Sequence, residues 1–338
     1  MVIGLLVILA LVLLLPFLVK QVEHNLEIFL FVMGIAAVLV SGVFSTELLL
    51  HALEDPVVIT IAVFIAGLLF KWLDAPLEKA VAKLSRMMPT RLLLAIIVIV
   101  LGLISSVITA MIAALVLVAI VSVLKLDRKS ELFVVVMACF SIGLGAALTP
   151  IGEPLSTITI SKLNGDFFLL LRELGLYIIP GVIVLGVLTA IMVKPGRTDD
   201  GLRAERTTES YKDIIIRTVK VYLFVFALVF LGSGFEPLIN LYLLDLNPYL
   251  LYWINIISAV LDNATLAAAE ISPEMSMTTV KAVLLGLIVS GGILIPGNIP
   301  NIISAGKLKI TSKEWARLGV PIGLAAMAVY FVIALFTL

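Results

Sequence analysis

The chain has 338 residues, 62% of them hydrophobic and 14% charged, with a formal net charge of +0. Soluble globular domains are about half apolar and about a quarter charged, so this composition excludes them and indicates a membrane protein whose main partner is the lipid bilayer. The neutral balance, and a sequence without phosphate-binding, metal or nucleophile motifs, argue against a nucleic-acid binder, an ATP-driven pump and an enzyme.

Eight apolar segments approach the roughly 20 residues that a helix needs to cross a bilayer. In chain order they are 1–19, 27–46, 56–73, 131–162, 167–193, 214–232, 281–307 and 314–337. The first segment lacks a basic start and a small-residue cleavage site, so we interpret it as a span and not as a signal peptide.

Two further apolar stretches, 92–124 and 249–271, differ from simple spans because polar residues interrupt them at their middle. The polar positions are Ser105, Ser106 and Thr109 in the first and Asp262 and Asn263 in the second. We predict that each stretch is a re-entrant hairpin, in which two short helices enter and leave on the same side with the polar tip at mid-depth. A single tilted span in each case is the alternative.

Lys and Arg are unevenly shared among the connecting segments. They gather in 71–91, 125–129, 194–213 and 306–317, whereas 45–55 and 233–248 contain none. If both hairpins return to the side they left, every basic segment lies in the cytoplasm, as the positive-inside rule requires. We therefore expect a multi-pass protein of the plasma membrane with both termini outside and the linker 194–213 in the cytoplasm.

The chain contains an internal repeat. GAALTPIGEPLSTITISK from Gly145 aligns without gaps with GGILIPGNIPNIISAGKL from Gly291, and both prolines match. The predicted spans give the two copies, 55–193 and 214–338, opposite orientations, with 1–54 as N-terminal scaffold spans. In secondary transporters, such inverted repeats hold the substrate and the coupling ion at mid-membrane between the copies. The predicted fold is an all-α polytopic membrane protein with two inverted-topology repeats, each with a re-entrant hairpin and a Pro/Gly-broken helix.

Two prolines four residues apart interrupt one predicted helix of each copy, within 131–162 and 281–307. Proline removes a backbone donor and unwinds the helix, which frees carbonyls and half-helix ends to hold an ion. A simple packing kink is the alternative. The expected lining residues are Thr149, Gly152, Glu153, Ser156 and Thr157 in the first break and Gly297, Asn298, Asn301 and Ser304 in the second.

Glu153 and Asp262 are the ionisable residues deepest in apolar sequence. A carboxylate there must be paired, neutral or bound to a cation, because a bare charge in the membrane is costly. Burial favours the protonated form of the carboxyl and a neighbouring cation favours the ionised form, so one site can exchange cations for protons. A structural, hydrogen-bonded carboxyl is the alternative for each residue.

The motifs TPIGEPLST and IPGNIPNII, each after a predicted hairpin, make residues 55–337 resemble the ion transporter superfamily. That group includes sodium-coupled divalent-anion symporters, arsenite permeases and sodium–proton antiporters. The second tip, Asp262-Asn263-Ala264-Thr265, is similar to the Asp-Asn-x-x-Thr of the last two branches. The sequence as a whole, including EHNLEIFLFVMG, is similar to an uncharacterised prokaryotic family loosely labelled as cation transporters. The resemblance implies an elevator mechanism, with a mobile transport domain on a homodimeric scaffold.

We expect a sodium–proton antiporter, because two carboxylates and no evident buried Lys or Arg favour a cation over an anion. Sodium is the one bound ion expected, without any other cofactor. The expected sodium ligands are Asp262, Asn263 and Asn298, and the further ion-binding candidates in the tips and breaks are Ser105, Ser106, Thr109, Thr265 and Asn301. A sodium-coupled anion symporter, holding a dicarboxylate or oxyanion at helix N-termini, is the alternative. A channel or a non-transporting membrane scaffold is a third hypothesis.

Overall fold

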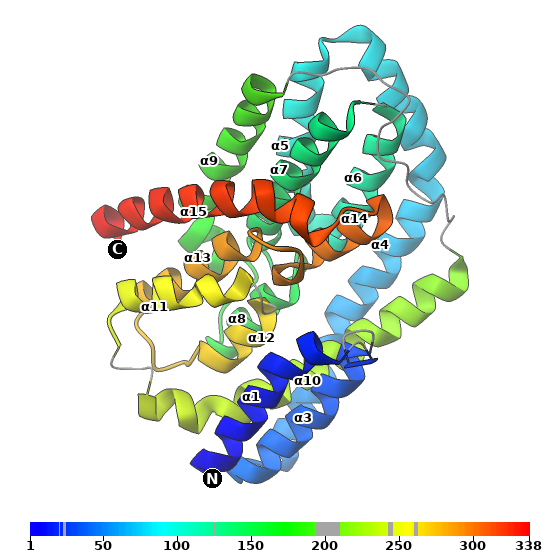
Figure 1. Ribbon diagram of the computed structural model, residues 1–338. Coiled ribbons are helices and arrows are strands. Elements are labelled where there is room, and N and C mark those ends of the chain that lie inside the picture. The colour runs from blue at the N-terminus through cyan, green and yellow to red at the C-terminus, as the bar shows by residue number, and fades with distance from the viewer. Residues whose placement is uncertain (20, 23–24, 125, 194–209, 243–245, 260–262) are drawn as a thin grey trace.

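The computed structural model describes the chain except for residues 20, 23–24, 125, 194–209, 243–245 and 260–262. The described residues fold into helices joined by short connections, and none of them forms a β-strand (Figure 1), which confirms the predicted all-α class. Several helices are long enough to span a membrane, which fits a multi-pass membrane protein. The five that meet both the length and the composition needed are Thr90–Ile108, Arg128–Ala146, Leu169–Met192, Tyr211–Leu238 and Ser312–Thr337.

Four helices form one group, in which the other three pack along α10 in the lower part of Figure 1 and the longest continues to the upper right. They are α1 (Val2–Leu18), α3 (Leu26–Ser41), α4 (Thr46–Met87) and α10 (Tyr211–Tyr242). Small residues let α3 and α10 approach closely, as they do in many membrane proteins. A Cβ on Gly34 would stand 2.8 Å from the Ala227 carbonyl oxygen, and one on Gly234 would stand 2.6 Å from the Ala37 side chain.

Helix α4 is longer than the sequence predicted. Its 42 residues run without interruption from Thr46 to Met87, although Pro56 and Pro76 lie inside it. The loop expected at 45–55 and most of the basic segment at 71–91 are therefore helical, and the domain boundary expected between residues 54 and 55 falls inside the helix. The reason is that a single proline removes one helix hydrogen bond, while the Leu, Ala, Glu and Lys residues around it are strong helix formers.

The two copies have the same order of elements. In the first, α5 (Thr90–Ile108) and α6 (Ala110–Leu124) are followed by α7 (Arg128–Ala146), α8 (Pro154–Lys162) and α9 (Leu169–Met192). In the second, α11 (Pro248–Ile254), the 3-10 helix η1 (Asn255–Ala259) and α12 (Asn263–Glu270) are followed by α13 (Met277–Gly291), the 3-10 helix η2 (Ile295–Gly297), α14 (Ile299–Leu308) and α15 (Ser312–Thr337). Both helix breaks lie at the predicted proline pairs.

The short helix after each break packs in the other copy. Helix α8 packs against α12, and α14 packs against α6, so each broken helix ends beside the hairpin of its counterpart (Figure 1). Helix α7 of the first copy lies between these contacts and itself packs against three helices of the second copy, α13, α14 and α15. There, Cys139 Sγ lies 3.5 Å from the Pro300 carbonyl oxygen and 3.4 Å from Ser304 Oγ.

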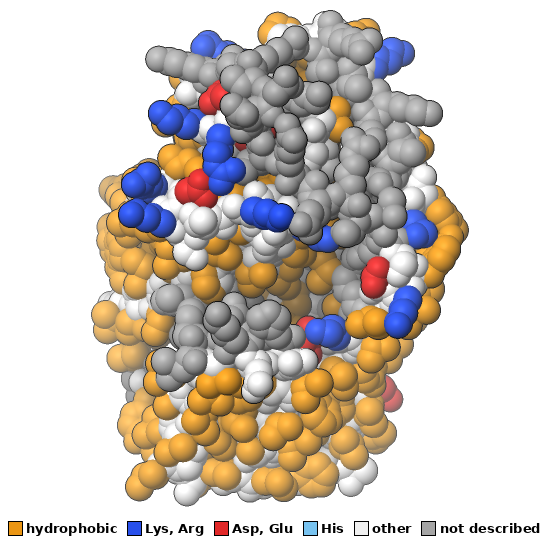
Figure 2. Space-filling model, turned by 45° about the vertical axis from the view of Figure 1, so that its right-hand side comes forward, with side chains coloured by type: hydrophobic (Ala, Val, Ile, Leu, Met, Phe, Trp, Pro, Cys, Tyr) orange, Lys and Arg blue, Asp and Glu red, His pale blue; other side chains and the backbone are white. Residues whose placement is uncertain are grey.

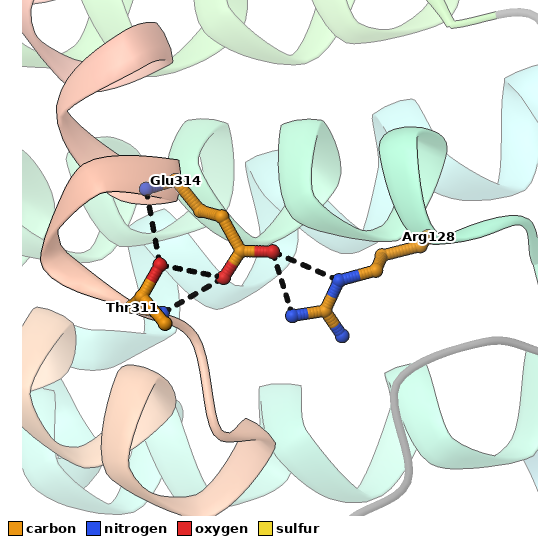
Figure 3. A network of polar contacts seen from close by, with 3 residues as sticks. All are labelled: Arg128, Thr311 and Glu314. Atoms are coloured by element: carbon orange, nitrogen blue, oxygen red, sulfur yellow. Dashed lines mark hydrogen bonds and ion pairs between the residues drawn. The ribbon is translucent and has the colours of Figure 1, made fainter.

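Among the residues that the structure describes, two ion pairs join the copies. Arg128 Nη2 at the start of α7 lies 2.7 Å from Glu314 Oε1 in the first turn of α15 (Figure 3). Lys281 Nζ in α13 lies 2.6 Å from Glu173 Oε2 in α9. Each pair links the helix before one break to the last helix of the other copy, so the two pairs are structural counterparts.

The outer surface is strongly apolar. Leu176 and Phe336, on α9 and α15, are 87% and 85% exposed. On the face shown in Figure 2, hydrophobic side chains cover most of the lower part, and Lys and Arg are more frequent toward the upper end. Large contiguous apolar surfaces of this kind are typical of proteins that contact lipid.

Candidate functional site

The first hairpin turns at Thr109. Helix α5 ends at Ile108 and α6 begins at Ala110, and Thr109 between them has φ 74° and ψ 147°. A positive φ is rare for a β-branched residue and costs on the order of 1–3 kcal/mol, so the surrounding structure must hold it. The Thr109 hydroxyl accepts a hydrogen bond from the Ile112 N–H at 3.3 Å and thereby caps the start of α6.

The tip of this hairpin contacts the first helix break. Thr149 Oγ1 donates a hydrogen bond to the Ser106 carbonyl, and the Ala110 N–H donates to the Gly152 carbonyl at 2.8 Å. Glycine is required at position 152, because a Cβ there would stand 1.9 Å from the Ala146 carbonyl oxygen. The structure therefore brings together three residues that the sequence assigned to the site, namely Ser106, Thr149 and Gly152.

Three other hydroxyl residues of the predicted site bond to backbone carbonyls. Ser105 Oγ donates to a carbonyl of α7 at 3.1 Å, Ser156 Oγ donates to Ala147 at 3.0 Å, and Thr157 Oγ1 donates to Pro150 at 2.7 Å. A helix break leaves carbonyls without their helical partners, and buried carbonyls need replacements. Ser156 and Thr157 bond to carbonyls of the break itself and so fix its shape, whereas Ser105 bonds to carbonyls inside α5 and α7.

Glu153 forms the N-cap of α8. The residue is 3% exposed and its backbone is extended, with φ −155° and ψ 158°. Its side chain makes no capping hydrogen bond to the N–H groups at the start of α8, which carry partial positive charge. The structure thus has a buried carboxyl at the first break, where the sequence predicted one.

The second hairpin is described in part. Asp262 lies outside the described residues, and so does the side chain of Thr265. Asn263, the first residue of α12, is 3% exposed, and its Nδ2 has no hydrogen-bond partner within the described part of the chain. On the other arm, Ser258 Oγ donates to the Leu287 carbonyl at 3.2 Å and so ties η1 to α13.

Three backbone carbonyls converge on Gly297 in the second break. A Cβ on Gly297 would stand 2.5 Å from the Ser258 carbonyl oxygen, 2.6 Å from that of Gly291 and 3.1 Å from that of Ala259. Tip and break therefore meet in this copy as well. These distances show that the hairpin and the break pack backbone against backbone at Gly297, in surroundings rich in carbonyl oxygens, the groups that coordinate sodium at helix breaks of secondary transporters. We call the carbonyls of Ser258, Ala259 and Gly291 around Gly297 the carbonyl cradle.

Two buried amides flank the carbonyl cradle. Asn301 Nδ2 donates to the carbonyls of Gly291 and Leu294, each at 2.9 Å. Its Oδ1 has no hydrogen-bond partner among the described residues, and neither has Oδ1 of Asn298, which is 1% exposed. Burying an amide oxygen without a partner is costly, so a donor or a cation is needed to complete both groups.

Asn298 also joins the second break to the first copy. A Cβ on Gly143 of α7 would stand 2.4 Å from Asn298 Nδ2, so the amide occupies space that only glycine leaves open. Helix α7 leads directly into the first break. The second break is thus enclosed by its own hairpin on one side and by the first copy on the other.

Lys162, at the end of α8, is a half-buried lysine whose ammonium lies against the second copy. Its Nζ donates to the carbonyls of Ala268 at 2.7 Å, Ile271 at 2.8 Å and Gly232 at 3.4 Å. Two of these carbonyls belong to the C-terminal end of α12, where unpaired carbonyls and the helix dipole attract a cation. The sequence shows Lys162 at the end of the first repeat motif, but its partners come from the other copy.

A cavity of about 230 Å³ lies beside Lys162, between α4, α8 and α10, and its ionisable lining residues are His51, Lys162 and Glu236. Sequence reasoning also missed Asn255 and Glu270, which are buried on η1 and α12. Glu270 lies three residues before Pro273, a position at which the sequence predicts only the end of a helix. Nothing in the sequence around Glu270 therefore indicates a binding site.

The donors at the two breaks are carbonyl, amide and carboxyl oxygens, which suit hard cations better than transition metals. Within the part of the chain that the structure describes, no group of three or more His, Cys, Asp or Glu could hold a metal ion.

A family model described as a protein of unknown function (DUF1646) matches residues 2–337. The chain belongs to this family. A search of the curated proteins finds no match. Because the DUF1646 match runs from α1 to α15, the N-terminal helices and both copies belong to one family unit.

Proposed function

We propose that this DUF1646 protein is a secondary active transporter that exchanges a monovalent cation, sodium, for protons. The observation that carries the proposal is the carbonyl cradle, with the unpartnered amide oxygens of Asn298 and Asn301 beside it. Unwound carbonyls and half-helix ends at a helix break are the groups that coordinate sodium in secondary transporters. They replace the water that the ion loses on entering the membrane.

The proton side of the exchange rests on buried carboxyls. Glu153 lies at the first break and Asp262, outside the described residues, belongs to the second hairpin tip. A cation and a proton both neutralise a buried carboxylate, so each weakens the binding of the other. Competition between the cation and the proton for the same carboxylate is enough to exchange one for the other. The only covalent bond that forms or breaks is the O–H bond of the carboxyl.

The arrangement of the helices supports an elevator-type alternating access. In this proposal the copies are inverted in the membrane, the hairpins are re-entrant, and α1, α3, α4 and α10 form a dimeric scaffold. The hairpins and broken helices form the moving transport domain. The repeated order of elements and the exchange of α8 and α14 between the copies support one transport domain built from both. The positive-inside rule gives both termini outside a plasma membrane.

The test uses the purified full chain in proteoliposomes that contain a pH-sensitive dye. An inward sodium gradient should move protons out and make the lumen alkaline, whereas an equal choline gradient should not. Asp262→Asn should abolish the response, and Asn298→Ala should shift it to sodium concentrations at least tenfold higher. Wild-type vesicles without sodium-driven proton movement would overturn the proposal.

A sodium-coupled anion symporter is the second candidate, favoured by the half-buried ammonium of Lys162. The N-termini of α8 and α14 could hold a carboxylate or oxyanion at the breaks. All three Lys162 bonds go to backbone carbonyls at the far end of α8, away from the break, which makes this candidate weaker. Sodium currents that require succinate, sulfate or arsenite, and that lack proton exchange, would favour it over the antiporter.

A further inference from the structure

A second buried carboxyl lies in the second copy, on the arm of the hairpin that leads away from its tip. Glu270 is the last residue of α12 and is 8% exposed. Its Oε2 has no hydrogen-bond partner among the described residues, and no ion pair within that part of the chain involves it. An ionised carboxylate in such surroundings is strongly disfavoured, so this group is either protonated or accompanied by a positive charge.

The side chain that meets Glu270 is a neutral amide. Asn255, at the start of η1, forms a hydrogen bond with the Glu270 carboxyl and is itself completely buried. Its Nδ2 also reaches the Val283 carbonyl at 3.4 Å, while its Oδ1 has no partner within the described residues. The pair therefore contains two buried acceptor oxygens that lack donors. A proton or a cation can satisfy them, and an anion cannot.

The charged groups on the helices packed against α12 are engaged elsewhere. Lys162 on α8 is bonded to backbone carbonyls and interacts electrostatically with Glu236 on α10. Lys281 on α13 forms an ion pair with Glu173. Neither of these two lysines is paired with Glu270 in the described structure, so neither of them neutralises it.

The 3-10 helix η1 connects Glu270 to the carbonyl cradle. Asn255 at the start of η1 contacts Glu270, and Ser258 and Ala259 at its end contribute two of the three cradle carbonyls. A 3-10 helix rises about 2 Å per residue, so Asn255 and Ser258 are separated by about 6 Å along it. Because Asn255 contacts Glu270 and lies on the same short helix as two cradle carbonyls, a cation in the cradle is expected to favour the ionised form of Glu270 in this poorly polarisable interior.

We propose that Glu270 is a proton-binding residue of the transport site, protonated in the absence of the cation and ionised when sodium occupies the carbonyl cradle. This inference rests on the proposed sodium–proton exchange. The O–H bond of the carboxyl breaks, its electron pair stays on the oxygen and the proton leaves to water. The cation thus binds at the carbonyl cradle and the proton binds at Glu270, and each weakens the binding of the other through charge repulsion.

The test compares Glu270→Gln with Glu274→Gln, a matched control four residues later at an exposed position. Calorimetric titration with sodium chloride, on the full chain in detergent, gives the sodium Kd at several pH values. For wild type and the control, the Kd should rise about tenfold per pH unit on the acid side, as linkage to one proton requires. For Glu270→Gln the Kd should lose this tenfold change per pH unit and keep only the pH dependence that the other buried carboxyls contribute. Infrared difference spectra should show sodium removing a protonated-carboxyl band that Glu270→Gln lacks.

Each outcome decides between the two proposals. A Glu270→Gln protein that keeps both the pH dependence and the infrared band overturns the role of Glu270 and leaves sodium–proton exchange standing. A wild-type protein that binds no sodium overturns the exchange, and acidification alone then shows whether Glu270 carries the band. If Glu270→Gln does not fold, Glu270→Asp keeps a carboxyl and should shift the pH at which the Kd begins to rise. An unchanged profile in Glu270→Asp contradicts the inference.

Discussion

The Glu314 carboxylate holds Arg128 with one oxygen and its own helix start with the other (Figure 3). Oε1 accepts hydrogen bonds from Arg128 Nε at 2.9 Å and Nη2 at 2.7 Å. Oε2 accepts from the backbone N–H and the hydroxyl of Thr311, each at 2.9 Å, and thereby completes the capping box of α15. The Glu314 side chain thus contributes both to the ion pair between the copies and to the N-terminal cap of α15. Mutation of Arg128 removes only the ion pair, whereas mutation of Glu314 removes both.

Removal of Arg128 should cost less stability than removal of Glu314. The pair is partly exposed, so Arg128→Ala is expected to lower the free energy of unfolding by about 0.5 kcal/mol. Glu314→Ala also removes the cap, and its cost should reach about 1.5 kcal/mol. Thermal unfolding in detergent measures both changes. Equal losses in the two variants would show that the capping box contributes nothing.

Gly297→Ala should abolish sodium binding. Its Cβ would stand 2.5 Å from the Ser258 carbonyl oxygen and 2.6 Å from that of Gly291, which forces the carbonyl cradle apart. Gly306→Ala is the matched control, because nothing lies within 4 Å of a Cβ at that position in α14. Calorimetric sodium titration of both variants checks the prediction. Wild-type affinity in Gly297→Ala would mean that sodium does not bind at the cradle.

The two buried asparagines should respond differently to alanine. Asn301 Nδ2 bonds two carbonyls of the break, so Asn301→Ala is expected to lower the free energy of unfolding by about 1–3 kcal/mol. Asn298 lacks such bonds in the described structure, so Asn298→Ala should weaken sodium binding at least tenfold and leave the unfolding temperature nearly unchanged. Binding and unfolding measured on the same samples separate these effects. The same response from both variants would contradict the assigned roles.

Thr109→Gly should stabilise the protein. Glycine adopts the φ of 74° without the cost that a β-branched residue bears, and loss of the cap to Ile112 costs only a few tenths of a kcal/mol. The expected gain is about 1 kcal/mol. Thr109→Val keeps the strain, removes the hydroxyl and should be less stable than wild type. Comparison of the two unfolding temperatures checks the prediction, and it is wrong if valine is tolerated better than glycine.

Much of the fold could be predicted from the sequence, because apolar length and paired prolines identify helices and their breaks. Both breaks lie at the expected prolines, and both hairpin stretches consist of two helical arms. The uninterrupted course of α4 could not be predicted, because a proline within a membrane helix bends some helices and ends others. Whether the hairpins are re-entrant and the copies inverted stays a prediction.

The candidate site was less accessible to sequence reasoning. Ser106, Thr149 and Gly152 were predicted from their positions and do meet. The carbonyl cradle was not predictable, because every residue has a backbone carbonyl. The residue types at positions 258 and 259, serine and alanine, therefore do not reveal that their carbonyls take part in a site. Lys162 and Glu270 were missed for a related reason, since their surroundings come from segments far away in the chain.

The exchange of α8 and α14 between the copies has a consequence for biosynthesis. Helix α8 is synthesised long before α12, the helix that it packs against. In the same way, α6 is synthesised long before its partner α14. Neither copy reaches its final packing until translation has passed residue 308. A chain cut within 194–209 should therefore yield two fragments that each fail when made alone and assemble when made in the same cell.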